Sequence, residues 1–401
     1  MSQKKLWMLA AILMICGTTA TRASCPKDDD SPTGAPLLTQ NAPTQANGPW
    51  LKRQVKALGQ LLDEWAIEGV DTNYLALPRY GWQAAVTANF AGINTKVEGH
   101  NIPTYGSINV DMHSSLSGQT SVSLGYRSLS FDYSFDMANG FSEDFNLSWL
   151  DNAWGIEYRS HSTEGLHGEL DASATPQSLP VSKGDTRMKA TLINGYYVFN
   201  PRRYSLPAAM DQSLIQKRSA GSFTAYALLL SARLEPQNKT LSTMLGGLKK
   251  IEFYQVALGL GYGYNYTPNR GRLLIHASAA PLLVFYNKNF LTASTGIPLP
   301  DGTVYQTDIS KEIETKHRYF LTGVARASVY YNISPHVHIG ANALLNDVRF
   351  ESASGLEMRM DDWIVNASIG VRFKNNKVFI LKQQSDETKI DEMDDGCHPD
   401  M

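Results

Sequence analysis

The sequence predicts an all-β protein: an antiparallel transmembrane β-barrel of about 12 strands, within a range of about 10 to 14, with a short N-terminal helix. Three observations predict it. Residues 252–266 alternate large apolar side chains with small or polar ones, over more than the roughly 9 to 11 residues that cross a bilayer as a tilted strand. Similar segments recur from Trp82 to Phe373, separated by short turns and longer loops. The mean hydropathy is -0.26, as expected when only alternate strand residues meet lipid.

The first residues predict export from the cytoplasm. Lys4 and Lys5 precede the apolar residues 6–16, and small residues follow, which is the pattern of a signal peptide ending at Ala23. A second interpretation is a lipoprotein acylated on Cys25. We expect an outer-membrane location, with the periplasm or a lipid anchor as alternatives. The expected organisation is signal peptide 1–23, disordered linker 24–49, helix and periplasmic lead-in 50–80, β-barrel 81–373 and disordered polar tail 374–401.

Alternation of apolar and polar residues defines the candidate strands in chain order. A change of phase at residues 127–128 requires a bulge within one strand or a break between two. Residues 288–315 are interpreted as a long polar loop. Because single-chain bacterial barrels usually have an even number of strands, we expect twelve. The candidates lie at 82–90, 108–112, 122–126, 129–137, 145–149, 154–158, 186–199, 222–234, 252–266, 272–285, 316–332, 336–350 and 359–373.

Polar residues that alternate with the apolar face are predicted to face the barrel lumen. Small and polar side chains on that face leave room for water or for one another. The predicted lumen-facing polar residues are Gln255, Asn265, Arg272, His276, Arg326, Asn342, Asn366 and Arg372.

Residues 195–223, which begin Gly-Tyr-Tyr-Val-Phe-Asn-Pro-Arg-Arg-Tyr-Ser-Leu-Pro, are not explained by strand periodicity. This segment resembles a family of exported barrel-type proteins of unknown function from Gram-negative anaerobes, and residues 70–74 and 126–130 are similar to it as well. The resemblance implies fold and location and carries no activity. Strand parity places the segment on the periplasmic side. Four of its basic residues are expected either to fold into the lumen or to contact a periplasmic protein: Arg202, Arg203, Lys217 and Arg218. The alternative is an ordered connection held by the packing of Tyr204 and Pro207.

Candidate catalytic and metal-binding residues are few. His276 and Ser278 share one strand face and resemble the His-x-Ser pair of outer-membrane phospholipase, but no matching Asn stands out, so we expect polar filling of the lumen. His336 and His338 are two potential ligands beside a turn, which is weak support for a metal. We therefore predict no enzymatic activity, no cofactor and no metal.

Three classes of function remain for a membrane barrel, and one for a soluble barrel. The first two are a narrow pore and an envelope scaffold or binding protein; an outer-membrane lipid hydrolase is less favoured. The soluble alternative is a periplasmic lipocalin-like barrel that binds an apolar ligand. Expected partners are outer-membrane lipid and lipopolysaccharide, the outer-membrane insertion machinery and a periplasmic protein. The last strand, which ends at the aromatic Phe373, resembles the signal that this machinery reads, although that Phe is usually C-terminal and here 28 residues follow it. The net charge of -2 gives no indication of a nucleic-acid partner.

Overall fold

The structure is a computed structural model, and the barrel unit is described by itself. The expected signal peptide, linker and polar tail, and with them Cys25, lie outside the described residues, and of the expected N-terminal helix the structure describes Leu62, Ala66 and Glu68. Among the described residues, no helix has the length and apolar character needed to cross a membrane. The structure describes residues 62, 66, 68–102, 106–114, 117–136, 142–172, 178–245, 247–298, 304–314, 319–351 and 356–373.

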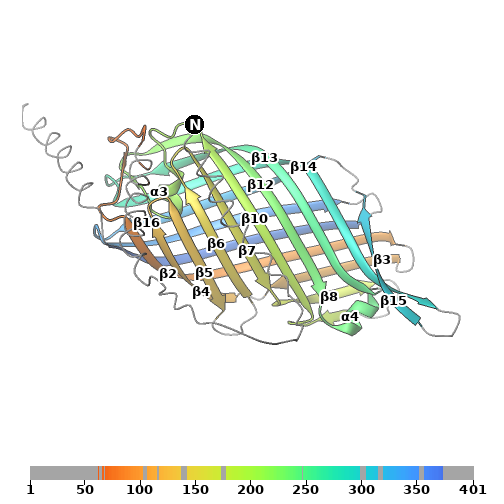
Figure 1. Ribbon diagram of the computed structural model, residues 1–401. Helices are drawn as coiled ribbons and strands as arrows, with labels where there is room; N and C mark the ends of the chain where they lie inside the picture. The colour runs from red at the N-terminus through yellow and green to blue at the C-terminus, as the bar shows by residue number, and fades with distance from the viewer. Residues whose placement is uncertain are drawn as a thin grey trace, which may run out of the picture. The chain divides into compact units, whose positions relative to one another are not determined.

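Nearly all described elements are antiparallel strands, accompanied by two short helices (Figure 1). The elements are β1 (Leu75–Ala76), β2 (Trp82–Ile102), β3 (Gly106–Ser114), β4 (Ser117–Tyr126), β5 (Leu129–Asp136), β6 (Ser142–Leu150), β7 (Trp154–Thr163), β8 (Leu166–Ala172), β9 (Leu179–Val181), β10 (Thr186–Val198), α3 (Leu206–Met210), β11 (Ile215–Gln216), β12 (Ala220–Pro236), α4 (Lys239–Met244), β13 (Leu248–Tyr266), β14 (Leu273–Pro298), β15 (Val304–Ile313), β16 (Phe320–Asn332), β17 (Val337–Glu351) and β18 (Leu356–Phe373).

Twelve strands close into a barrel, which confirms the predicted fold class. The order around the wall is β2, β4, β5, β6, β7, β10, β12, β13, β14, β16, β17 and β18, and β18 pairs with β2 to complete the ring. The thirteenth candidate, at 108–112, lies in β3, which pairs with the far half of β2 and with β8 beyond the wall. The predicted loop at 288–315 is wrong in part: β14 continues to Pro298 and pairs with β15.

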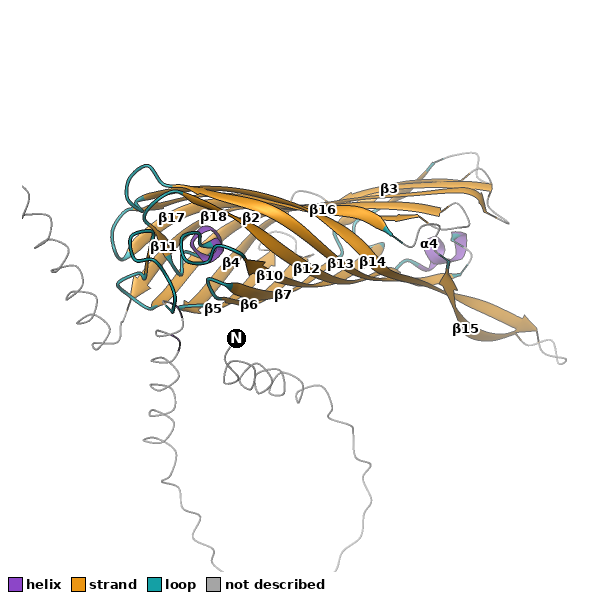
Figure 2. Ribbon diagram, turned by 90° about the horizontal axis from the view of Figure 1, so that it is seen from above, coloured by secondary structure: helices purple, strands orange, loops and turns teal. Residues whose placement is uncertain are grey.

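The two ends of the barrel are built differently. At one end, here named the short-turn end, β2 begins, β18 ends, and short turns join neighbouring strands. One of these turns explains the change of phase at 127–128: Arg127 has a positive φ of 53° and separates β4 from β5, so the strand breaks and does not bulge. At the other, the long-strand end, β2 extends well past β4 and β14 extends well past β16 (Figure 2).

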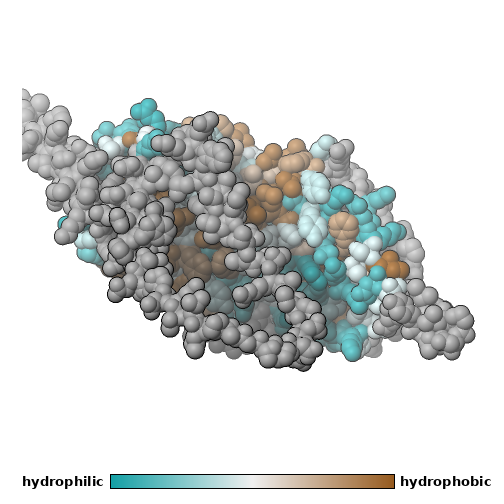
Figure 3. All heavy atoms as spheres, viewed as in Figure 1, coloured by the Kyte–Doolittle hydropathy of each residue, from teal (hydrophilic) through white to brown (hydrophobic). Residues whose placement is uncertain are grey.

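The outer face of the wall is apolar. On β13, Leu258 and Leu260 are each 52% exposed, whereas Phe253 and Ala257 of the opposite face are buried. Hydrophobic side chains gather over the visible wall, and hydrophilic ones lie towards the end that carries α4 (Figure 3). Exposed aromatic residues cluster where strands reach the short-turn end: Tyr197, Phe223, Tyr262, Tyr264, Tyr266, Tyr331 and Phe373.

Part of the inner face is also apolar, which the sequence did not predict. Alternation on β12 puts Leu228 and Leu230 inside, where they belong to one buried cluster with residues of the opposite wall such as Val348 and Met360. We call this cluster the apolar layer. Its buried members are Ile93, Leu166, Met188, Ala190, Leu192, Leu228, Leu230, Ala232, Phe253, Ala257, Ala280, Leu282, Val284, Val348 and Met360.

The connection between β10 and β12, residues 199–219, folds into the short-turn end of the lumen, and we call it the plug (Figure 2). It carries α3, which begins after the N-cap Ser205 with Pro207 in its first turn, as helix starts favour. Its β11 pairs with β1 of the lead-in segment. Apolar residues of α3 pack against Leu274 and Tyr330 of the wall. The plug is therefore an ordered part of the barrel interior.

Candidate functional site in the barrel lumen

Hydrogen bonds from the wall hold the plug at the end of α3. The last carbonyl groups of a helix have no partner within the helix, so something else must satisfy them when they are buried. Here wall side chains from β2, β16 and β18 donate to carbonyl groups at the end of α3 and just beyond it. The donor-to-carbonyl pairs are Ser328 to Ala209 at 2.7 Å, Tyr330 to Met210 at 2.7 Å, Gln83 to Asp211 at 3.0 Å and Arg372 to Gln212 at 3.3 Å.

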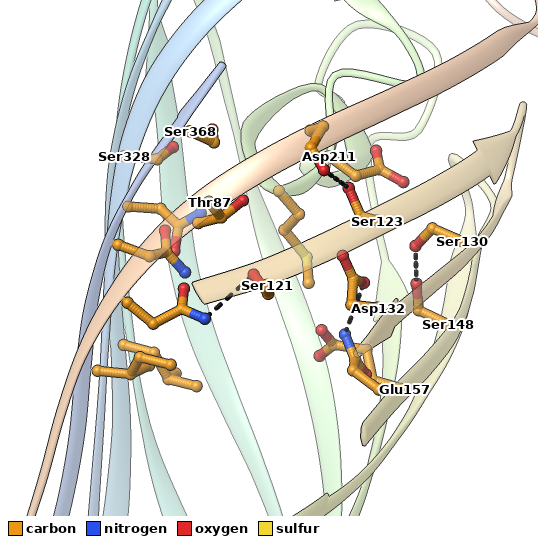
Figure 4. Close-up of a pocket in the computed structure, with 18 of the residues that line it drawn as sticks. Thr87, Ser121, Ser123, Ser130, Asp132, Ser148, Glu157, Asp211, Ser328 and Ser368 are labelled. Carbon is orange, nitrogen blue, oxygen red and sulfur yellow. Dashed lines mark hydrogen bonds between the residues drawn. The ribbon is translucent and has the colours of Figure 1, made fainter. Parts of the chain in front are cut away.

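A polar chamber of about 220 Å³ lies in the lumen beside the plug. Hydroxyl, amide and carboxyl groups from several strands point into it, and Asp211 of the plug lies at its edge (Figure 4). Ser130 and Ser148 hydrogen-bond across neighbouring strands at 2.6 Å, and Asn146 donates to Asp132 at 3.4 Å. The plug contributes Ala209, Met210 and Asp211 to the lining. The chamber is therefore a polar space between wall and plug.

The cationic groups that line the chamber are paired with carboxylates. Arg326 donates to Glu157 at 2.6 Å. Asp144 lies 2.7 Å from His161 Nδ1 and 3.4 Å from Arg159 Nε. Buried charges need such partners because leaving water is costly. The chamber consequently presents hydrogen-bonding groups and paired charges to any solute that enters it.

Asp211 is an ionisable group of the plug that faces the chamber. One carboxyl oxygen accepts from the Ser213 N–H at 2.9 Å, and the other has no hydrogen-bond partner within the described residues. Burial raises the pKa of Asp211 from 3.8 to about 7; the Ser213 bonds oppose the shift, and the charges of Asp132 and Glu157 add to it. The plug thus carries a carboxyl group that titrates near neutral pH.

The structure distributes the predicted lumen-facing residues among several roles. His276, Arg326, Asn342 and Asn366 line the chamber. Arg372 and Asn265 contact the plug, at Gln212 and Ser205, and Gln255 donates to the Arg349 carbonyl beside the apolar layer. Arg272 differs from the prediction: it lies in the turn before β14, where alternation no longer applies, and its side chain is exposed.

The four basic residues of the plug lie near its surface around the lead-in segment. Arg203 lies 3.8 Å from Asp71, and its guanidinium is 5.1 Å from the centre of the Tyr74 ring. Lys217 donates to the Thr72 carbonyl at 3.2 Å. Arg202 and Arg218 are exposed. Part of this basic cluster therefore fastens plug and lead-in together, and part faces outwards.

The His276–Ser278 pair does have an asparagine partner, contrary to the expectation from sequence. Asn265 Oδ1 lies 2.8 Å from His276 Nδ1, and His276 Nε2 lies 3.0 Å from Ser278 Oγ. Asn265 is on β13, whose register with β14 places it directly opposite His276. The sequence hid the partner because pairing register, and not chain distance, brings the two residues together.

Other functional residues escaped sequence analysis for different reasons. Glu157, Arg159 and His161 alternate on β7, so a search for charged residues at every second position would find them. Ser328 and Tyr330 give no comparable signal, because their role depends on where the plug folds. Among the described residues no group of three or more His, Cys, Asp or Glu is arranged to hold a metal ion.

Comparisons with known proteins place this chain in context. The family described as Domain of unknown function (DUF4421) matches residues 70–373. Solved structures with similar folds include the outer-membrane protease OmpT from Escherichia coli (TM-score 0.36, 10% identity, covering 74% of this chain and 97% of that chain). Another is the toluene transporter TodX of Pseudomonas putida (TM-score 0.26, 10% identity, covering 73% of this chain and 89% of that chain). A third is the outer-membrane protein OprG of Pseudomonas aeruginosa (TM-score 0.24, 7% identity, covering 75% of this chain and 100% of that chain). No curated protein matches the chain.

Proposed function

From the premise that the chain belongs to the family Domain of unknown function (DUF4421), we propose that it is an outer-membrane barrel that works as a gated narrow pore for small polar solutes. The observation that carries this proposal is the polar chamber of about 220 Å³ between the wall and the plug. A barrel used only as a membrane anchor has no need of a polar interior space.

The outer surface supports a membrane location. Burying apolar area from water is worth roughly 25 cal/mol per Å², so a face with Leu258, Leu260 and Leu283 about half exposed favours lipid over water. The exposed aromatics at the short-turn end fit the girdle that such barrels place at the membrane interface. A soluble lipocalin-like barrel has the opposite pattern on its outside, so we do not favour that alternative. Outer-membrane lipid and lipopolysaccharide are the expected surroundings.

Both ends of the chamber must open for conduction. At the short-turn end the plug blocks the lumen through directional hydrogen bonds that can break without unfolding the wall. Towards the long-strand end the apolar layer brings opposite walls into contact, and apolar constrictions stop conduction by excluding water. We therefore expect a pore that is closed at rest and opens when the plug moves and the layer hydrates.

Planar-bilayer conductance tests the pore role. The Ser328→Ala, Arg372→Met variant loses the hydrogen bonds that both side chains donate to the plug, whereas Ser368→Ala removes a chamber hydroxyl whose hydrogen bond goes to the wall carbonyl of Gly340. We expect rare openings for the wild type and Ser368→Ala, and frequent ones for the double variant. Each barrel must first shift in gel mobility on heating, which shows that it is folded. A folded double variant with a protease-sensitive plug and only background conductance would exclude the pore role.

A second candidate role, an envelope scaffold, is favoured by the exposed Arg202 and Arg218 on the plug surface. These cations lie at the end where the chain enters and leaves the barrel, which a membrane barrel turns to the periplasm. Reversing both charges to Glu should remove a cross-linked periplasmic protein. Arg270→Glu together with Arg272→Glu, at an exposed turn of the same end, is the charge-matched control and should leave the cross-link intact. If both variants lose the cross-link equally, the partner responds to the net charge of this end and not to the plug.

A further inference from the structure

One chain of hydrogen bonds runs from the plug to Ser278 and determines which ring nitrogen of His276 carries the proton. Asn265 Nδ2 donates to two plug oxygens, the Ser205 carbonyl at 2.7 Å and Gln216 Oε1 at 2.9 Å. Asn265 Oδ1 is therefore the atom that faces His276 Nδ1 at 2.8 Å. An amide oxygen can only accept, so Nδ1 carries the proton and Nε2 is left with its lone pair towards Ser278 Oγ at 3.0 Å.

The plug determines this orientation through Gln216. Gln216 Nε2 donates to the carbonyl oxygens of Arg203 at 2.6 Å and Arg218 at 2.8 Å, so its Oε1 must be the acceptor for Asn265. Gln216 is almost fully buried. The direction of each hydrogen bond in the chain is thus set by fixed backbone carbonyls of the plug.

We propose that Ser278, His276 and Asn265 form a nucleophile, general base and positioning residue for acyl transfer to small polar esters in the lumen. A serine hydroxyl becomes a useful nucleophile when a histidine in the correct tautomer accepts its proton and a third group orients that histidine. All three conditions hold here, with Asn265 as the orienting group. This inference goes beyond the pore or scaffold role. It needs small solutes to enter the chamber and to reach Ser278, which lies beside the lining residues His276 and Arg326 and is not itself part of the lining.

Two buried donors next to Ser278 are free to stabilise a developing negative charge. Tyr204 Oη and Arg326 Nε have no hydrogen-bond partner within the described residues. Arg326 faces Ser278 directly across β14 and β16. A Cβ added to Gly263 would lie 2.2 Å from Tyr204 Oη and 3.2 Å from Ser278 Cβ, so the glycine lets both groups share this spot. Such preorganised donors are what an oxyanion of acyl transfer requires.

The proposed reaction is balanced by groups already in place. Ser278 Oγ bonds to the ester carbonyl carbon, the carbonyl π electrons move to oxygen, and the hydroxyl proton passes to His276 Nε2. Tyr204 and Arg326 donate hydrogen bonds to the oxyanion. Asn265 Oδ1 accepts a hydrogen bond from the Nδ1 proton of His276 and so stabilises the imidazolium. The bond to the leaving alcohol then breaks, and that oxygen takes the proton from His276. Water attacks the acyl-serine by the same route and releases the carboxylic acid.

Position and space define the substrate class. His276 and Arg326, on either side of Ser278, line the chamber, and Ser278 is on the inner face of β14, away from lipid. A cavity of about 220 Å³ holds a short acyl group such as acetyl and excludes a fatty acyl chain. The polar lining suits an ester of a hydroxylated alcohol. The expected substrates are therefore short-chain acyl esters of polar alcohols.

Labelling by a small alkyl fluorophosphonate tests the proposal on the full-length protein in detergent. The reagent phosphonylates an activated serine with loss of fluoride, and mass spectrometry locates the label. We expect labelling at Ser278, hydrolysis of 4-nitrophenyl acetate, and loss of both in Ser278→Ala. His276→Ala should slow labelling by about 10²–10⁴-fold. Ser142→Ala, which removes an inward-facing serine that is hydrogen-bonded to Thr163 of the wall, should label as the wild type does.

Two further comparisons test whether Asn265 acts by orienting His276 and whether small molecules can enter the chamber. Asn265→Asp and Asn265→Leu both lose the two bonds donated to the plug, but only Asp keeps the acceptor for His276; we expect labelling with Asp and not with Leu.

The Ser368→Cys variant, altered on the chamber wall, should react with methyl methanethiosulfonate at its new thiol. If that thiol reacts and Ser278 of the folded wild type does not, the triad is inactive. If neither group reacts, the chamber is closed to small molecules and the proposal is equally overturned.

Discussion

The lumen is filled in two different ways, by the plug at the short-turn end and by the apolar layer towards the long-strand end. The plug is held by hydrogen bonds that run from wall side chains to specific carbonyl groups, such as Tyr330 to Met210. The apolar layer is held by contact between side chains such as Leu282 and Val348, with no polar atoms to align. The first type of contact is directional and sensitive to protonation, whereas the second depends on volume and area.

This difference indicates which end is suited to regulation. A hydrogen-bonded segment can leave as a unit, because water replaces each of its bonds when it undocks. Apolar side chains that belong to the wall cannot leave without moving the strands. We therefore expect the apolar layer to determine global stability and the plug to determine local opening. Four predictions test this contrast, from the largest expected effect to the smallest.

The largest effect should come from the apolar layer. Leu282 is 1% exposed and its neighbour Leu283 is 46% exposed. Leu282→Ala should lower the free energy of unfolding in lipid vesicles by about 2–5 kcal/mol, because it leaves a cavity. Leu283→Ala removes the same atoms from the lipid face without making a cavity, and should cost less than half as much. Equal losses in urea titrations of the two variants would show that the layer is not packed.

A smaller and local effect is expected at the plug. Tyr330 is 4% exposed and donates to Met210, whereas Tyr331 is 41% exposed on the outer face. Tyr330→Phe should weaken plug docking by about 1–3 kcal/mol, since it leaves a buried carbonyl without its partner. The measurement is the rate of proteolysis within residues 199–219, with Tyr331→Phe as control. Faster global unfolding without faster cleavage of the plug would contradict the local role.

Plug docking should also depend on pH. The pKa of Asp211 is about 7 when the plug is docked and 3.8 when the carboxyl group is in water. The docked state therefore binds the proton more tightly than the undocked state does. Docking is therefore strongest below about pH 4 and weakens as pH rises towards 7. Proteolysis of the plug, corrected for protease activity, should increase from about pH 5 to about pH 8, and the increase should be absent in Asp211→Asn. The nearby charges of Asp132, Glu157 and Arg372 are retained in both proteins.

The smallest effect is expected at the exposed surface of the long-strand end. Lys249 and Asp308 form an ion pair at 2.7 Å with both side chains about half exposed. Exposed pairs contribute about 0–1 kcal/mol and are screened by salt. Lys249→Ala should therefore change the urea midpoint slightly at low salt and not at all in about 1 M salt. A loss of stability as large as that of Leu282→Ala would mean that the exposed surface of the long-strand end contributes strongly to the stability of the barrel.

Much of the fold was predictable because strand periodicity is a local property. The outer face of β13, with Leu258, Leu260 and Tyr262, follows from alternation alone, and so do the twelve wall strands once one extra candidate is set aside. The same alternation placed His276 and Arg326 inside. It could not tell that Leu228 and Leu230 also face inwards, because an apolar residue on either face of a lipid-bound barrel gives the same sequence pattern.

The sequence by itself determined that this chain forms an antiparallel barrel with an apolar outside, since side-chain alternation along each strand needs no knowledge of its neighbours. Only the tertiary structure decided that residues 199–219 fold into the lumen and that Asn265 meets His276. Those arrangements depend on register between strands and on which buried carbonyl finds which donor. Such pairings join residues far apart in the chain, and no local pattern records them.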